Sequence, residues 1–141
     1  MGYAPIAVTA SRTLGNYEAG TVVVVNAAAG LTLTLPASSG NGTEYEIFIG
    51  TTVTSNSVII QVANSSDVMA GQAIMATDNA SDVVISFETA STSDTITMNG
   101  TTKGGILGDR IRLRDVATNV WSVLMTGSAT GTEVTPFSAA V

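Results

Sequence analysis

Apolar and polar residues alternate along residues 108–126, GDRIRLRDVATNVWSVLMT, and a period of two is typical of β-strands with one buried face. In the first half, Ile111 and Leu113 would face the core and the arginines between them would face solvent. In the second half, the inward set is Trp121, Val123 and Met125. Residues 115–119 would form the turn, because Asp and Asn readily hydrogen-bond their own backbone. The stretch therefore predicts a β-hairpin, with Trp121 either in the core, the favoured reading, or exposed as an interface anchor.

The same pattern predicts strands along most of the remaining chain. Their ranges are 21–25, 31–35, 45–49, 58–62, 68–77, 83–87 and 95–98. The run TVVVV at 21–25 suggests a strand buried on both faces, whereas Leu alternates with Thr in 31–35 and suggests one buried face. Within 68–77, Gly71 suggests two short strands separated by a bend or a bulge.

Short strands of this number, about nine or ten, with a turn signal every 8 to 12 residues, are the pattern of an all-β sandwich or barrel. No window shows a helical stripe, and there are no heptads or fixed repeats of the kind found in fibrous shafts. A chain of 141 residues fits a single domain. We therefore expect a compact, jelly-roll-like β-domain over residues 13–141, preceded by an extended N-terminal arm over residues 1–12.

The N-terminal segment contains Pro5 and small residues and shows no amphipathic pattern. Three interpretations are open: an edge strand over residues 6–9, a frayed end, or an arm that orders by adding a strand to a partner's sheet. In the third case its larger side chains would contact the partner. These are Tyr3, Pro5, Ile6, Val8 and Arg12.

Charged residues make up 11% of the chain, against roughly 25% in typical soluble domains. Ser, Thr, Asn and Gly must therefore provide much of the solvated surface. This composition favours a subunit of a large assembly, although a free β-protein with a neutral, Thr-rich exterior remains an alternative.

The formal net charge of −6 argues against nucleic acid as a partner, because phosphate binding requires a concentrated positive field. Four of the five basic residues nevertheless lie within a dozen positions. They are Lys103, Arg110, Arg112 and Arg114. The arginine strand is either a solvated face or a basic stripe that meets an acidic neighbour and fixes its orientation.

Little catalytic chemistry is available, because the chain has neither His nor Cys. A serine nucleophile with an imidazole base and a thiolate metal site are both excluded. No motif supports a Ser–Lys103 dyad, and pairs such as Glu44 with Glu46 lie in or beside turns, where acids commonly serve solvation. Residues 78–82, DNASD, lack the spacing of an EF-hand and are better read as a solvated loop. We expect a non-enzymatic protein without a cofactor or a bound metal.

The N-terminus lacks the basic start and apolar core of a signal peptide, and no run approaches the ~20 apolar residues of a membrane helix. We therefore expect a protein that is made in the cytoplasm and does not contact a membrane.

Two long segments and the C-terminus carry a resemblance to a known class of proteins. They are LTLTLPASSGNGTEYEIFIGTTVTSN (residues 31–56), DTITMNGTTKGGILGDRIRLRDVATNVWSVLMTGSATGTE (residues 94–133) and TPFSAAV. These segments resemble small structural proteins of tailed bacteriophages, above all the head decoration, or cement, proteins on the outside of the capsid. The likeness lies in the pattern of strand and turn residues and includes no invariant motif.

The resemblance implies a compact β-fold that assembles into homotrimers or similar clusters on the outer capsid surface. It also implies that the major capsid protein is the partner, and that binding stabilises the expanded shell. The N-terminal arm and one end of the domain would then make the contact, with Arg110, Arg112 and Arg114 as further candidates.

Two alternatives remain open. A tail fibre, tail-tip or baseplate component would bind a host surface, although such fibres usually show repeats or coiled coils. A carbohydrate-binding module or glycan hydrolase domain would need exposed aromatic rings, whereas aromatic residues are 5% of this chain and fall mostly at positions expected in the core.

Overall fold

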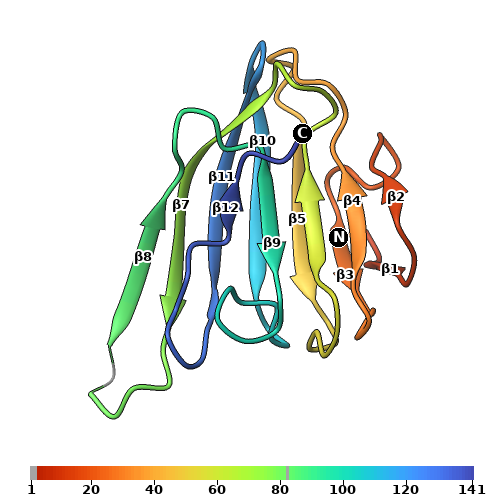
Figure 1. The fold of residues 1–141 in the computed structure, drawn as a ribbon. Helices are drawn as coiled ribbons and strands as arrows, with labels where there is room; N and C mark the ends of the chain where they lie inside the picture. Colours follow the sequence, from red (N-terminus) through yellow and green to blue (C-terminus); the bar gives the residue numbers. More distant parts are fainter. Residues whose placement is uncertain (1–2, 82) are drawn as a thin grey trace.

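Two β-sheets packed face to face form the protein in the computed structural model, which describes residues 3–81 and 83–141 (Figure 1). The larger sheet has seven strands in the order β1 (Ile6–Val8), β3 (Val22–Val25), β5 (Glu44–Ile49), β10 (Arg110–Ala117), β11 (Val120–Ser128), β7 (Val68–Ala76) and β8 (Val84–Glu88). The smaller has five, in the order β12 (Phe137–Ser138), β9 (Thr95–Met98), β6 (Val58–Gln61), β4 (Leu31–Thr34) and β2 (Arg12–Thr13). The prediction of an all-β sandwich or barrel is confirmed, and of the two the structure is a sandwich.

The core lies between the sheets and is built from the alternating apolar positions of the strands. Each inward set expected from the sequence is buried: Leu31, Leu33 and Leu35; Tyr45, Ile47 and Ile49; Ile111 and Leu113; and Trp121, Val123 and Met125. The Tyr45 and Trp121 rings pack with their centroids 6.0 Å apart. Trp121 is therefore a core residue. In β3 only Val23 and Val25 are fully buried, so the expectation of burial on both faces is wrong for this strand.

The first six strands alternate between the two sheets. Strands β1, β3 and β5 run parallel in the larger sheet, and β2, β4 and β6 run parallel in the smaller one. Each connection in this part of the chain crosses to the other sheet, so successive strands within one sheet run in the same direction. A jelly roll has antiparallel sheets, whereas five of the ten strand pairings among the described residues are parallel. The topology therefore differs from the jelly-roll-like arrangement that was expected.

The β10–β11 hairpin occupies the centre of the larger sheet, where β10 also pairs with β5 and β11 also pairs with β7. Ile111 lies opposite Met125 and Leu113 opposite Val123, as the alternation predicts. The turn is shorter than the expected residues 115–119, because Ala117 already pairs with Val120 across a bulge. Asn119 closes the turn at a φ of 62°, a left-handed conformation that Asn tolerates.

Strand β7 is continuous, so the two pieces expected around Gly71 are wrong. Its parallel register with β11 is unbroken from Val68 to Ala76. The glycine instead permits a close approach of two backbones, since a Cβ at Gly71 would lie 1.8 Å from the carbonyl oxygen of Val123.

The N-terminal segment is built into both sheets instead of extending from them. Strand β1 is an edge strand paired with β3, Val8 is buried in the core, and β2 pairs with β4. Thr21 also donates a hydrogen bond from its hydroxyl to the Ala4 carbonyl at 2.9 Å. The edge-strand interpretation fits this structure, and the proposed boundary at residue 12 does not separate an arm from the domain. Residues 1 and 2 lie outside the described part of the chain.

Candidate interaction surface

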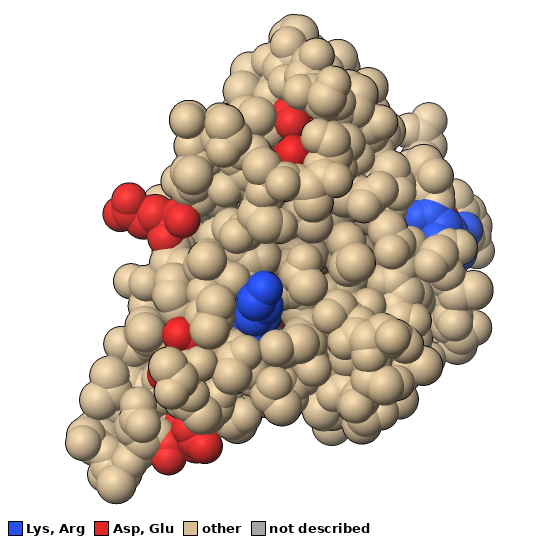
Figure 2. Space-filling model, in the orientation of Figure 1, with Lys and Arg blue, Asp and Glu red and all other residues tan. Residues whose placement is uncertain are grey.

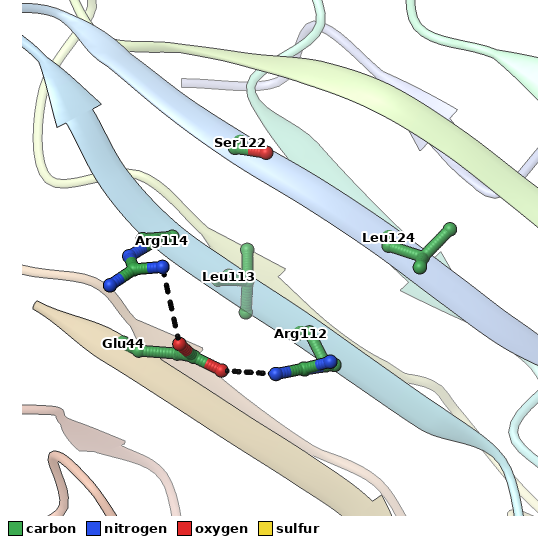
Figure 3. A pocket seen from close by; sticks show the side chains of 6 residues that line it. All are labelled: Glu44, Arg112, Leu113, Arg114, Ser122 and Leu124. Carbon is green, nitrogen blue, oxygen red and sulfur yellow. Dashed lines mark hydrogen bonds and ion pairs between the residues drawn. The ribbon is translucent and has the colours of Figure 1, made fainter. Parts of the chain in front are cut away.

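The three arginines of β10 point outward from the larger sheet and meet two glutamates of β5. The antiparallel register places Arg112 opposite Glu46 and Arg114 opposite Glu44. Arg112 Nη2 lies 2.8 Å from Glu44 Oε1, and Arg114 Nη1 lies 3.9 Å from Glu44 Oε2 (Figure 3). Arg110 Nε lies 3.5 Å from Glu46 Oε1. We call these five residues the charge ladder.

Of the two interpretations of the arginine strand, a solvated face or a stripe that meets an acidic neighbour, the structure shows features of both: the arginines are exposed, and acidic neighbours lie within the same chain. The hydrogen bond and the charge of Glu44 raise the pKa of Arg112. Three arginines face two glutamates, which leaves one positive charge in excess. More than half of each arginine side chain is exposed, so the ladder is open to a partner.

A hollow of about 190 Å³ lies over the ladder and is lined by Glu44, Arg112, Leu113, Arg114, Ser122 and Leu124 (Figure 3). Pockets that bind small molecules typically enclose roughly 300–1,000 Å³. The hollow is smaller than such pockets, and it combines one acid, two guanidinium groups, a hydroxyl and apolar surface. This arrangement suits contact with a broad partner surface better than enclosure of a substrate.

A second hollow, of about 520 Å³, lies beside the N-terminal segment and has two exposed tyrosines in its lining. Tyr3 is 84% exposed and Tyr17 is 76% exposed. The other lining residues are Ala4, Ile6, Asn16, Ala19 and Thr21. Among the described residues, no charged side chain lines this hollow, which we call the tyrosine groove.

A third hollow joins the tyrosine groove to the charge ladder. Tyr3 and Thr21 also line the groove, and Glu44 and Glu46 also belong to the ladder. The N-terminal segment and the arginine strand, which are far apart in the sequence, thus lie along one continuous surface. It runs over the outer face of β3, β5 and β10.

The predicted contact residues differ in how far they are exposed to solvent and thus to a partner. Tyr3, Pro5 and the three arginines are exposed, and Ile6 is half-buried in the groove. Val8 is 3% exposed and belongs to the core, so it cannot contact a partner directly. Arg12 pairs with the buried Glu18 at the edge of the smaller sheet.

Tyr17 was not predicted, although the sequence contains a usable signal. It stands in NYEAG, a polar stretch that ends at a glycine and has no alternation to place an aromatic ring in the core. A large aromatic residue in a turn is a candidate for an exposed contact.

The opposite face of the molecule is nearly free of charge. The smaller sheet lies in front in Figure 1, and the same view in Figure 2 shows only scattered charged side chains on a largely neutral surface. The pairings place Thr34 beside Gln61, and Thr32 and Thr97 on either side of Ile59, on the outer face of this sheet. The hydroxyl-rich composition is thus concentrated on this sheet.

Several carboxylates that sequence reasoning passed over are buried and bind loop backbone. Asp109 Oδ2 accepts hydrogen bonds from the N–H groups of Gly105 and Ile106, and its Oδ1 accepts one from Ser128. Burial raises the pKa of Asp109, and these three bonds offset only part of that effect. Asp94 similarly accepts hydrogen bonds from the C-terminal Ala140 and Val141. These acids hold the fold together and have no basic partner for catalysis in these contacts.

Asp115 plays the same role at the other end of β10. Its carboxylate accepts hydrogen bonds from the Ser39 N–H at 2.9 Å and the Gly40 N–H at 2.6 Å. Burial alone would raise the pKa of Asp115, but hydrogen bonds from Ser39, Gly40 and Asn41 together bring it below its ordinary value.

The acidic loop over residues 78–82 offers no assembled ion site within the described chain. Asp78 accepts a hydrogen bond from the Gly131 N–H at 3.2 Å, and Asp82 lies outside the described residues. Over residues 3–81 and 83–141, no three acidic side chains gather in a way that could hold a metal ion. The described part of the chain also contains no helix able to span a membrane.

Comparisons with protein-family models, with curated proteins and with solved structures gave no match.

Proposed function

We propose that this chain is a non-enzymatic structural protein of a virus particle, which decorates the outside of a bacteriophage capsid by binding the lattice of the major capsid protein. The contact surface would be the tyrosine groove together with the charge ladder. Bound copies would stabilise the shell, and the resemblance further implies that they cluster as trimers.

The continuous surface is the observation that carries this proposal. It combines two exposed tyrosines, which are enriched at binding hot spots, with exposed arginines held in a fixed geometry by Glu44 and Glu46. Ordered charges of this kind orient a partner more than they add affinity. The low overall charge and the neutral opposite face accord with a subunit packed among many copies.

Cosedimentation with undecorated capsid shells tests the proposal. Tyr17→Ala should weaken binding at least tenfold. Arg114→Glu reverses a charge on the contact surface and should also weaken binding, and this loss should grow as the salt concentration falls because the charges are then less screened. Leu107→Ala is a matched control, since Leu107 is also an exposed large hydrophobic residue, at 60%, but lines none of the three hollows. Shell binding by Tyr17→Ala and Arg114→Glu at wild-type strength would reject the proposed surface.

Deleting residues 1–12 would not be a clean test of an arm. The deletion removes β1 and the buried Val8, together with Arg12 at the start of β2. Loss of binding would then reflect a damaged fold, so the point variants above replace it.

A tail fibre, tail-tip or baseplate role is the alternative within virus particles. Copy number separates the two roles: hundreds of copies per particle indicate the head, and a few to a few tens indicate the tail.

A glycan-binding module is a second candidate that one observation favours. The sequence placed most aromatic residues in the core, but Tyr3 and Tyr17 are exposed in an uncharged groove with the Asn16 amide and the Thr21 hydroxyl in its lining. Rings in such positions can stack on sugars. Saturable binding in a glycan screen that is lost in Tyr17→Ala but kept in Leu107→Ala would establish this function.

A further inference from the structure

In the part of the chain that the structure describes, the two sheets have four edge strands, and β8 is the least protected of them. Strands β1, β2 and β12 have three, two and two residues, and Pro5 directly precedes β1. Strand β8, VISFE, has five residues without proline, lysine or arginine, and its register with β7 shows no bulge. Short length, proline, bulges and lysine are the usual devices that keep an edge from pairing.

The free backbone groups of β8 can be assigned from its hydrogen bonds to β7. Thr77 donates its N–H to the Val83 carbonyl at 3.3 Å, and Thr89 donates to the Gly71 carbonyl at 3.1 Å. Bonded pairs alternate along an antiparallel ladder, so the intervening odd-numbered residues also bond to β7. The N–H and C=O groups of Val84, Ser86 and Glu88 therefore point away from the sheet.

The inner face of β8 is also incompletely covered. The larger sheet has two more strands than the smaller, and no strand of the smaller sheet lies in front of β8 in Figure 1. Ile85 and Phe87 point inward on this overhang and are half-buried against the margin of the core. An added strand would extend the larger sheet and cover both side chains.

We infer that β8 pairs with β8 of a second copy, antiparallel and centred on Ser86. In this register Ser86 faces Ser86 of the second copy, and Val84 faces Glu88, so the free backbone groups bond one another. Ile85 then faces Phe87 of the second copy in a non-bonded pair, where side chains approach most closely. The strand is thus complementary to itself in both backbone and side chains.

Charge favours the antiparallel arrangement over a parallel one. Glu88 is the only charged residue of β8, and antiparallel pairing places the two Glu88 side chains at opposite ends of the contact. Parallel pairing in register would set them side by side, where like charges repel.

The contact is isologous and closes after two copies. It therefore does not build the trimer that the resemblance implies, but would join monomers into dimers or trimers into hexamers. The inference does not depend on the capsid-binding role, because β8 lies at the opposite end of the larger sheet from β1 and the tyrosine groove.

A single cysteine tests the register directly, because the natural chain has none. Paired Cα atoms at Ser86 would be about 5.5 Å apart, within the range that a disulfide spans. Under mild oxidation, Ser86→Cys should form a covalent dimer at least tenfold faster than Thr126→Cys, an exposed control on β11 in the middle of the same sheet that lines none of the three hollows. Equal rates for the two variants would overturn the inference.

The native mass provides a second test through light scattering. Ser86→Pro removes an N–H that points to solvent in the single copy, a position where an edge strand accepts proline. We expect Ser86→Pro to halve the native mass, and Ser86→Thr, which keeps the N–H, to preserve it. An unchanged mass in folded Ser86→Pro would overturn the inference, and the cysteine test decides the matter if that variant does not fold.

Discussion

Strand β10 places charged residues in two opposite environments. Asp109 just before it and Asp115 near its end are 1% and 2% exposed and bind backbone N–H groups, whereas the arginines between them are exposed and pair with glutamates. Among the described residues, neither buried acid forms an ion pair, so the loops that they hold depend directly on these carboxylates. Exposed ion pairs contribute little to stability, because water and salt compete with both partners. The comparison indicates that the aspartates maintain the fold, while the arginines are free to serve binding.

The largest effect is expected from Asp109→Ala. This change leaves the N–H groups of Gly105, Ile106 and Ser128 without their acceptor, and should lower the free energy of unfolding by about 3–5 kcal/mol. Urea denaturation followed by Trp121 fluorescence measures it. Asp78→Ala, at an exposed aspartate with a single hydrogen bond in the described structure, should change stability far less. Similar losses in both variants would remove the distinction between buried and exposed acids.

Asp115→Asn should have a smaller effect, about 1.5–3 kcal/mol, because the amide keeps one acceptor oxygen for the loop at Ser39 and Gly40. The same denaturation experiment applies. Glu46→Gln also neutralises a carboxylate beside β10, but on the exposed face, and provides the matched control. A Glu46→Gln variant as unstable as Asp115→Asn would contradict the comparison.

Lowering the pH should change the contributions of Asp115 and Asp109 to folding stability in opposite directions. The lowered pKa of Asp115 stabilises the fold above the ordinary Asp value of 3.8, and this contribution is lost as the pH falls through the folded-state pKa. The raised pKa of Asp109 has the opposite effect on stability. As the pH falls from neutral, the folded state binds a proton at Asp109 before the unfolded state does, so acidification stabilises the fold. The stability gap to wild type should therefore shrink below about pH 3.8 for Asp115→Asn, and widen on acidification from neutral pH for Asp109→Asn. Gaps that move in the same direction would refute this assignment.

The smallest effect is expected from Glu44→Gln. The change removes the carboxylate shared by Arg112 and Arg114, but both side chains are exposed, so the urea midpoint should not shift measurably at physiological salt. Capsid binding measured on the same samples should change, because the guanidinium groups lose their fixed orientation. A clear loss of stability would instead make the ladder a structural element.

The sequence by itself determined the class of fold and most of the core. Alternation fixes which side of a strand faces inward, so Ile111, Leu113 and Trp121 could be assigned to the core without knowledge of any neighbouring strand. The absence of His and Cys likewise limits the chemistry that this chain can perform, whatever its fold, because no arrangement of strands can supply an imidazole or a thiolate.

Only the tertiary structure decided which strands are neighbours, because alternation carries no information on pairing partners. Parallel pairing of alternate strands in the N-terminal half joined the N-terminal segment to the sheets, and the β5–β10 register supplied Glu44 and Glu46 as partners for the arginines. The buried roles of Asp109 and Asp115 were hidden for the same reason. A carboxylate beside a strand looks solvated in sequence, until a distant loop such as residues 38–43 brings its backbone N–H groups to it.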